Sequence, residues 1–249
     1  GYKSNEIQGV KYFNYDIEEI EQIQNRDFDT CFHLAAQSRV QPSFLNPQES
    51  IRVNVNGTNR VMEWAKKRNV KVIYAGSSSK HYDPSDSPYA MSKYLGEEIC
   101  KLYKKSFHVN VEIARFYNVY GPGENIDEKF GNVIGIWSAK IQNNEPIPIV
   151  GDGEQKRDFI HVLDLVDGLI KIAKTNHIHN DAWELGTGVN YSVNELFNFF
   201  KEKYKVKSTY IPDQEGNYRK TLRINDDALK LLNWKPNDRL KSHIKSLNL

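Results

Sequence analysis

Residues 72–105, VIYAGSSSKHYDPSDSPYAMSKYLGEEICKLYKK, decide the fold. The stretch opens on an apolar run typical of a buried strand, passes through three serines, and continues as a helix that carries Tyr89 and Lys93. Four residues make about one helical turn, so the Tyr89 and Lys93 side chains project from one face of that helix. The strand therefore delivers hydroxyl groups toward a phenol that has an ammonium beside it.

A tyrosine beside a lysine can act as a general base. A free tyrosine titrates near about pH 10, so action near neutrality requires a pKa lower by ~3 units, or ~4 kcal/mol. A nearby cation such as Lys93 favours the phenolate. The spacing alone also arises by chance on exposed helices. Its position at a helix start, after a strand that ends in Ser77, Ser78 and Ser79, favours the catalytic interpretation.

Composition excludes several classes of protein. The 249 residues include 34 basic and 32 acidic ones, a net charge of +2, so we expect no nucleic-acid partner. Cys31 and Cys100 make neither a metal-binding pattern nor a disulfide framework. Because no apolar run is long enough to span a bilayer, we expect a cytoplasmic protein with no membrane partner.

Strand-like and helix-like segments alternate along the first part of the chain. Strands are predicted at residues 10–17, 28–37, 72–75, 109–121 and 182–188, and helices at 17–24, 50–68 and 88–105. This order predicts an α/β fold with a Rossmann-type doubly wound parallel sheet. Residues 1–120 and 158–188 would form this dinucleotide-binding domain, and residues 121–157 and 189–249 a smaller α/β substrate-binding lobe. Within the lobe we expect a hairpin turn at residues 151–153 and a capping box that opens a helix at Ser192.

Six segments, in this order, resemble signatures of the extended short-chain dehydrogenase/reductases, specifically the nucleotide-sugar epimerase/dehydratase family. They are FHLAAQ (32–37), VNVNGT (53–58), YAGSSS (74–79), SPYAMSKYLGEE (87–98), RFYNVYGPGE (115–124) and VGDGEQKRDFIHV (150–162). The resemblance covers about residues 10–188. It implies that a nicotinamide cofactor, NAD with NADP left open, lies along the sheet. The cofactor-binding residues that it implies are Asp16, Ile17, Leu34, Ala35, Ala36, Asn54, Ser77, Tyr89, Lys93 and Phe116. Close helix–strand packing is the alternative for Ala35 and Ala36, and a helix cap for Asn54.

The resemblance also implies the catalytic set. Tyr89 would be base and acid, and Lys93 would lower its pKa and hold ribose hydroxyls of the cofactor. Ser78 is the favoured serine for the reacting sugar oxygen, Ser79 is second, and Ser77 is favoured as structural. Tyr89 would take a proton from a sugar hydroxyl while hydride passes to NAD. The resulting ketone would turn over in the pocket and take the hydride back on its other face.

Substrate-binding residues follow from the same resemblance. They are Ser79, Asn118, Asn132, Val133, Arg157 and Arg219. Arg157 matches a diphosphate-binding arginine, and a guanidinium fork meets phosphate oxygens bidentately. An ion pair with Asp158 or Asp152 is the alternative for Arg157. His161 resembles a packing histidine.

The sequence departs from the family in four places. No G-x-G-x-x-G occurs, so we expect a glycine-rich βαβ segment upstream of Gly1. The loop between Ser79 and Tyr89 is short, which predicts a more open rim over the sugar. Lys80 and His81 stand where dehydratases carry an Asp-Glu pair, which argues against dehydration. Gln214 and Asn217 stand where relatives often carry Arg and Asp.

The first hypothesis is therefore an epimerase acting at C4 of a UDP-hexose with bound NAD. The alternatives are an NAD(P)H-dependent 4-keto nucleotide-sugar reductase and a non-catalytic dinucleotide-binding relative. A homodimer is expected, in which the helices at 50–68 and 88–105 pair with their copies in a four-helix bundle, as they do in the family. The sugar and the nucleotide base are not determined by the sequence.

Overall fold

The computed structural model describes residues 6–23, 27–128 and 130–249. Its main sheet has four parallel strands in the order β1-β2-β3-β7. They are β1 (Thr30–His33), β2 (Lys71–Ser77), β3 (Val111–Phe116) and β7 (Trp183–Leu185). Both β2 and β3 are nearly continuous runs of buried residues, as expected where the two faces of a parallel sheet are covered. The predicted Rossmann-type parallel sheet is confirmed.

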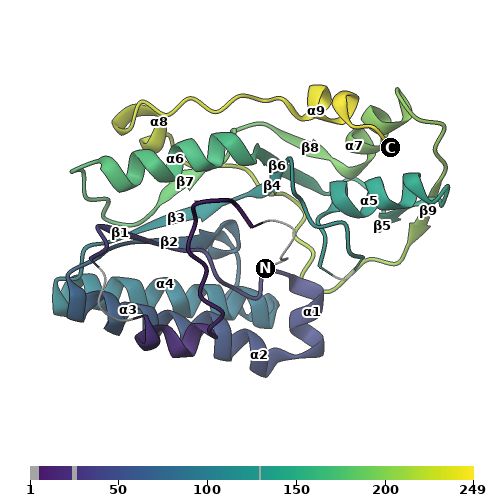
Figure 1. The fold of residues 1–249 in the computed structure, drawn as a ribbon. Helices are drawn as coiled ribbons and strands as arrows, with labels where there is room; N and C mark the ends of the chain where they lie inside the picture. The colour runs from purple at the N-terminus through teal and green to yellow at the C-terminus, as the bar shows by residue number, and fades with distance from the viewer. Residues whose placement is uncertain (1–5, 24–26, 129) are drawn as a thin grey trace.

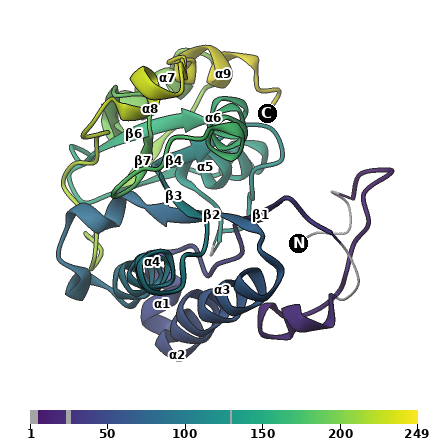
Figure 2. The ribbon, with the colours of Figure 1, turned by 90° about the vertical axis from the view of Figure 1, so that its left-hand side faces the viewer.

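Helices cover both faces of this sheet (Figures 1 and 2). On one face lie α3 (Gly57–Arg68) and α4 (Pro88–Phe107), and on the other lie α6 (Val162–Lys174) and α8 (Asp227–Leu231). Strand β2 serves both layers. Val72 and Tyr74 pack in the core with α3 and α4, whereas Ile73 packs in the core with α6. Successive side chains of a strand point to opposite faces, so one apolar strand supplies two cores.

The helical run before β2 is longer than predicted and is interrupted once. It follows α1 (Val40–Leu45) and consists of α2 (Pro47–Ile51), a π-helical turn at residues 52–56, and α3. Asn54 lies in the π turn and is buried. Asn69 ends α3 in the left-handed region, with φ +52°. A π turn inside an α-helix often marks a functional position, and this one faces α4.

Helix α4 has clear boundary signals. Ser87 caps it by accepting a hydrogen bond from the Ala90 amide, Pro88 is its first residue, and His108 ends it with φ +55°. These signals place Tyr89 in the first turn and Lys93 in the second, directly beside the carboxyl end of β2.

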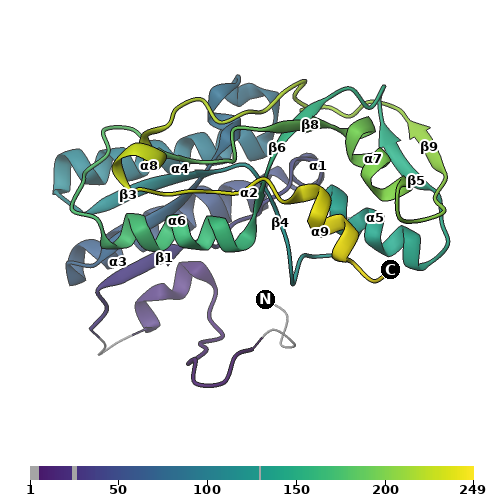
Figure 3. The ribbon, with the colours of Figure 1, turned by 90° about the horizontal axis from the view of Figure 1, so that it is seen from above.

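Past β3 the chain passes into a second group of elements. It contains β4 (Asn118–Tyr120), β6 (Lys156–His161) and β8 (Asn190–Ser192) in one sheet, β5 (Ile147–Val150) and β9 (Ser208–Ile211) in another, and helices α5 (Val133–Gln142), α7 (Val193–Lys201) and α9 (Leu240–Ser246). Figure 3 shows α5, α7, α9, β5 and β9 gathered at one end of the molecule. A third core forms there around Trp137 and Phe200. Trp234, near the end of the chain, packs instead in the core under α6. The predicted domain boundaries stay a prediction.

Two local predictions are wrong. Residues 10–16 form no strand, although VKYFNYDI alternates apolar and polar residues. Their side chains are mostly exposed, and Asp16 instead caps the 3-10 helix η2 (Ile17–Gln22), which packs on α3. The turn at residues 151–153 exists, with Gly151 at φ +59° and Gly153 at φ +75°. It joins β5 to β6, which belong to different sheets, so it is not a hairpin.

A buried cluster of charges ties α4 to the sheet. Arg115 on β3 forms ion pairs with Glu97 at 2.8 Å, Asp181 at 2.7 Å and Glu184 at 3.1 Å. Glu97 lies on α4 and Glu184 on β7, and both are 0% exposed. Both carboxylates lie without access to water and share the Arg115 guanidinium as a counter-charge, and His81 also contacts Glu184 at 3.0 Å.

Replacing Arg115 by Met should therefore lower the free energy of unfolding by about 3–5 kcal/mol, because it leaves buried carboxylates unpaired. Urea denaturation followed by circular dichroism measures the change. Arg52 is a matched control, since it also contacts three carboxylates, those of Asp16, Glu18 and Glu49, but at the surface. Arg52→Met should leave the unfolding midpoint almost unchanged. Equal losses at both sites would contradict this account.

Candidate active site

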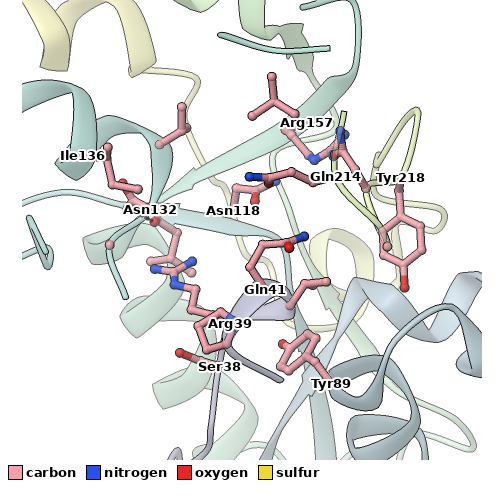
Figure 4. A pocket seen from close by; sticks show the side chains of 18 of the residues that line it. Ser38, Arg39, Gln41, Tyr89, Asn118, Asn132, Ile136, Arg157, Gln214 and Tyr218 are labelled. Atoms are coloured by element: carbon pink, nitrogen blue, oxygen red, sulfur yellow. Dashed lines mark hydrogen bonds between the residues drawn. The ribbon is translucent and has the colours of Figure 1, made fainter. Parts of the chain in front are cut away.

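A cavity of about 1000 Å³ lies at the carboxyl ends of β1, β2 and β3, between the main sheet and the elements around α5. The carboxyl ends of parallel strands meet at one edge of a sheet, which is where α/β folds place ligands. Figure 4 shows side chains entering this cavity from opposite walls, with Tyr89 at one wall and Arg157 at the other.

Tyr89 and Lys93 both reach the end of β2. The Tyr89 hydroxyl donates to the Ser77 hydroxyl at 3.3 Å, and the Lys93 ammonium donates to the Ala75 carbonyl. The Lys93 nitrogen also lies 4.5 Å from the centre of the Tyr74 ring. Lys93 is 5% exposed, and no carboxylate pairs with it in the part of the chain that the structure describes. Tyr89, Lys93 and the serine turn, which the sequence predicted to lie close together, do so in the structure.

The pKa of Tyr89 differs from the lowered value that the sequence predicted. Burial raises the pKa of Tyr89, while the hydrogen bond with Ser77 and the charge of Arg39 act in the opposite direction. Lys93 is not among the groups that lower the pKa of Tyr89. Burial lowers the pKa of Lys93 itself to about 8. The predicted lowering of the Tyr89 pKa by Lys93 is therefore absent, because the ammonium is directed at the backbone of β2.

The three serines have different surroundings. Ser77 accepts hydrogen bonds from the Tyr89 hydroxyl, the Ser79 hydroxyl and the Ser79 amide. Ser79 is buried, and Ser78 is partly exposed. All three line the cavity, and the Ser78 hydroxyl makes no hydrogen bond within the described residues. Ser77 thus holds the turn and Tyr89 in place, and Ser78 presents a hydroxyl with its hydrogen-bonding capacity free.

His81 anchors the serine turn to the buried charge cluster. Its Nε2 lies 3.0 Å from Glu184 Oε1, and Glu184 also accepts from the Tyr117 hydroxyl at 2.7 Å. Because Glu184 also pairs with Arg115, the position of the turn is coupled to the core under α4.

The residues predicted for the cofactor separate into two groups. Leu34, Ala36, Ser77, Tyr89, Lys93 and Phe116 line the cavity, whereas Asp16, Ile17, Ala35 and Asn54 do not. Asp16 is held by Arg52, and the Ile17 side chain packs against Gly57. Asn54 bridges Gln37, whose amide and carbonyl it bonds, to the hydroxyl of Ser92. Its amide group therefore fixes the loop that follows β1.

On the opposite wall, Asn118, Asn132, Val133 and Arg157 line the cavity as predicted. Asn132 caps α5 by accepting from the Gly135 amide. Arg157 pairs with neither Asp158 nor Asp152; it donates to Asn217 and to the Lys156 carbonyl. Arg219 lies outside the cavity, where it pairs with Asp152 at 2.8 Å. Its guanidinium is thus engaged at the surface.

Residues 212–221, here named the cleft strap, close the side of the cavity beside the short loop at 79–89. Gln41 donates to the Glu215 carbonyl at 2.8 Å, and the Tyr82 and Tyr218 rings stack with centroids 4.0 Å apart. Gly216 has φ +70°, and a Cβ there would lie 2.8 Å from Val40, so the close approach requires glycine. The strap thus packs against the short loop, and the more open rim than in relatives stays a prediction.

The polar lining residues that sequence reasoning missed include Ser38, Arg39, Gln41 and Tyr218. The first three follow β1 directly. Polar residues just after the carboxyl end of a parallel strand are the signal that could have identified them.

A metal site and a membrane span were sought within residues 6–23, 27–128 and 130–249. No group of three or more His, Cys, Asp or Glu side chains there is arranged to hold a metal ion. None of the helices described combines the length and the apolar character needed to cross a membrane. The predicted cytoplasmic location stays a prediction.

Comparisons with known proteins agree with this geometry. The family model described as "NAD dependent epimerase/dehydratase family" matches residues 3–186. A Methanocaldococcus jannaschii protein that carries the name "Putative UDP-glucose 4-epimerase" is 35% identical, over 98% of this chain and 85% of its own length. A UDP-glucose 4-epimerase from Thermotoga maritima, solved with UDP-glucose, has a TM-score of 0.90 at 26% identity, covering 98% of this chain and 85% of that one. A UDP-glucuronic acid 4-epimerase from Bacillus cereus, solved with UDP-glucuronic acid and NAD, has a TM-score of 0.82 at 25% identity, covering 94% and 77%.

The desolvated Lys93 gives a pH-dependent test. Its pKa is about 8 in the folded protein, below the value for unfolded lysine, so the unfolded state binds more protons between the two values. The stability of the wild type relative to Lys93→Met should therefore rise by about 2 kcal/mol from about pH 7 to about pH 9.5. Urea unfolding of both proteins across this range measures the difference. A difference that does not change with pH would show that the ammonium keeps its hydration.

Proposed function

The chain belongs to the NAD dependent epimerase/dehydratase family, and we propose that it is a nucleotide-sugar epimerase that inverts C4 of a UDP-hexose. The observation that carries the proposal is the hydrogen bond between Tyr89 and Ser77 beside the buried Lys93, in a cavity large enough for a nucleotide sugar.

The residues present fit the nicotinamide end of an NAD molecule. Ala36 and Gly76 keep the cavity wall beside β1 and β2 free of large side chains. An ammonium has three donors, and the described hydrogen bonds of Lys93 use one, on the Ala75 carbonyl. The remaining donors are available for ribose hydroxyls. When bound, NAD supplies an acceptor for the hydride of the sugar carbon and returns that hydride later.

Tyr89 is the proposed proton acceptor and donor at the sugar hydroxyl. Its hydroxyl lies at the cavity wall, and Ser77 fixes its direction. The partly exposed Ser78 is the proposed contact to the same sugar oxygen, because its hydroxyl is not used by the described residues. Since the oxidised sugar carbon is planar, the face that takes the hydride back decides its configuration. After the sugar has turned, that is the opposite face, and Tyr89 would return the proton to the sugar oxygen. The net redox change is zero.

The opposite wall is proposed to hold the nucleotide and diphosphate. The cap of α5 at Asn132 and Val133 presents the amide end of a ten-residue helix, which favours an anion. Arg157 adds a guanidinium that Asn217 orients. Burial lowers the pKa of Arg157, so its partly buried charge would be stabilised by a phosphate partner.

A homodimer is part of the proposal. Helices α3 and α4 lie side by side on one face of the sheet, as a four-helix bundle with a second copy requires. Leu102 and Phe107 on α4 are 52% and 45% exposed, so they offer apolar surface to such a bundle.

Size-exclusion chromatography with light scattering should therefore give twice the chain mass. Leu102→Glu should shift the protein toward the monomer, because a charge buried at the bundle is costly. Ile170→Glu is a matched control, since Ile170 is 41% exposed on α6, which covers the opposite face of the sheet. A wild-type monomer would refute the dimer.

Tyr89→Phe should reduce kcat about 10²- to 10⁴-fold, because it removes the proton-transferring hydroxyl. Turnover is measured as interconversion of UDP-glucose and its C4 epimer by the NAD-loaded protein. Tyr94→Phe, one turn further along α4 and outside the cavity lining, is the matched control and should keep wild-type activity.

Two outcomes would contradict the proposal. Activity of Tyr89→Phe within about tenfold of the wild type would remove Tyr89 from the chemistry. Product that forms only with added reduced cofactor would identify a keto-sugar reductase, because an epimerase consumes no reducing equivalents.

A further inference from the structure

Tyr218, on the cleft strap, brings a phenol to the cavity wall. Its hydroxyl oxygen is shielded from water, and within residues 6–23, 27–128 and 130–249 it has no hydrogen-bond partner. A buried hydroxyl without a partner costs free energy, because it has lost its hydrogen bonds to water and gained none. A phenylalanine would keep the ring without this cost. The hydroxyl of Tyr218 therefore indicates a partner that a ligand supplies.

The cleft strap holds the Tyr218 hydroxyl in a fixed position. The Tyr218 ring stacks on Tyr82 with an interplanar angle of 15°, and the Tyr82 hydroxyl donates to the Lys220 carbonyl of the same strap. Gln41 holds the strap at the Glu215 carbonyl. The hydroxyl of a phenol lies in the plane of a rigid ring, so fixing the ring fixes the oxygen. A ligand that meets this hydroxyl finds it already in place.

The strap backbone places Tyr218 at the end of the cavity that carries Tyr89. A Cβ on Gly216 would lie 3.4 Å from the Ser87 Cβ, so the strap contacts the cap of α4, two residues before Tyr89. A smaller cavity of about 220 Å³ at the wall proposed for the diphosphate is lined by Arg157 but by neither Tyr89 nor Tyr218. Figure 4 shows the hydroxyl end of Tyr218 directed away from Arg157. The position of Tyr218 is thus that of the sugar and not of the diphosphate.

The Tyr218 hydroxyl is a donor and not a base. Burial raises its pKa to about 12, and the nearby Asp86 and Tyr89 add to that shift. The phenol therefore keeps its proton near neutral pH. A neutral hydroxyl suits another hydroxyl, since each can donate and accept, whereas a phosphate favours a charged donor. Hydroxyl groups are what a hexose presents around its reacting carbon.

We propose that the Tyr218 hydroxyl donates a hydrogen bond to a hydroxyl group of the bound hexose, which makes Tyr218 a substrate-binding residue that positions the sugar at Tyr89. This inference rests on the proposed epimerase function and adds a contact to the same site. Ser78 and Tyr89 take the reacting oxygen, so Tyr218 meets another hydroxyl of the sugar. The contact belongs to the sugar alone, and it therefore distinguishes a UDP-hexose from UDP.

Tyr218→Phe removes the hydroxyl and keeps the stacked ring. Isothermal titration calorimetry of the NAD-loaded protein compares UDP-glucose with UDP, which lacks the sugar. In Tyr218→Phe the affinity for UDP-glucose should fall about 3- to 10-fold, the loss of one neutral hydrogen bond, and the affinity for UDP should stay within about twofold. In turnover, the KM for UDP-glucose should rise while kcat stays within about threefold, because the contact lies away from the reacting oxygen.

Tyr210→Phe is the matched control. Tyr210 lies on β9 just before the strap, is 59% exposed and is outside the cavity lining, so both affinities should match the wild type. Urea unfolding separates binding from structure. Tyr218→Phe should keep or raise the unfolding midpoint, because it removes a buried hydroxyl that has no partner. Tyr82→Phe should lower the midpoint, because the hydrogen bond to Lys220 is lost.

The remaining outcomes distinguish this contact from the epimerase itself. Equal weakening of UDP-glucose and UDP would make Tyr218 a nucleotide contact and overturn the proposal. An unchanged affinity for UDP-glucose in Tyr218→Phe would also overturn it, while C4 epimer formed by the wild type would leave the epimerase standing. Binding of UDP-glucose that depends on Tyr218, without epimer formation, would keep the sugar contact and refute the epimerase. A wild type that binds neither ligand would overturn both.

Discussion

The contact between helix α4 and the end of strand β2 fixes the chemistry of this protein. Tyr89 and Lys93 are four residues apart on a helix, a rise of about 6 Å. They bond Ser77 and the Ala75 carbonyl, two residues apart on a strand, a rise of about 6.6 Å. The two spacings nearly match, so a helix that runs back along the strand can set both side chains at once. The cap at Ser87 and the ion pair of Glu97 with Arg115 hold α4 in that register.

The buried cations of this structure differ in whether a carboxylate of the protein neutralises their charge. Arg115 is 2% exposed and surrounded by carboxylates from three segments, so its charge is neutralised within the protein. Lys93, Arg39 and Arg157 line the cavity and contact mainly backbone carbonyls or an amide, and burial lowers the pKa of each. Desolvated charge without a counter-ion is expensive unless a ligand supplies the partner. The distinction separates a cation neutralised within the protein from cations that we propose to meet the negative groups of a cofactor or substrate.

Much of the site could be predicted from sequence because it is local. The helix start at Ser87 and the spacing of Tyr89 and Lys93 follow from capping and periodicity, and the buried runs of β2 and β3 from parallel-sheet composition. The features of the site that could not be predicted from the sequence depend on contacts between distant segments. Three adjacent serines are chemically identical in the sequence. Only the path of the turn determines that Ser77, and not Ser78 or Ser79, accepts the hydrogen bond from Tyr89. Arg39 resembles any surface arginine until α5 and Phe130 are placed against it. Apolar and polar residues alternate along residues 10–16 as they do in a strand, but a strand forms only where a neighbouring strand can pair with its backbone.

The cleft strap couples the closing of the cavity to the orientation of its cation. A short loop at 79–89 would leave the sugar end open, and the strap fills that space through the stacked pair Tyr82 and Tyr218. The same segment carries Asn217, which accepts the hydrogen bond that orients Arg157 and is held in turn by Asp213. A displacement of the strap would therefore both admit water beside Tyr89 and release the guanidinium on the opposite wall. Under the proposed function, a substrate that bridges the two walls would stabilise the closed strap from both sides, so exclusion of water at the reacting carbon would depend on binding at the diphosphate.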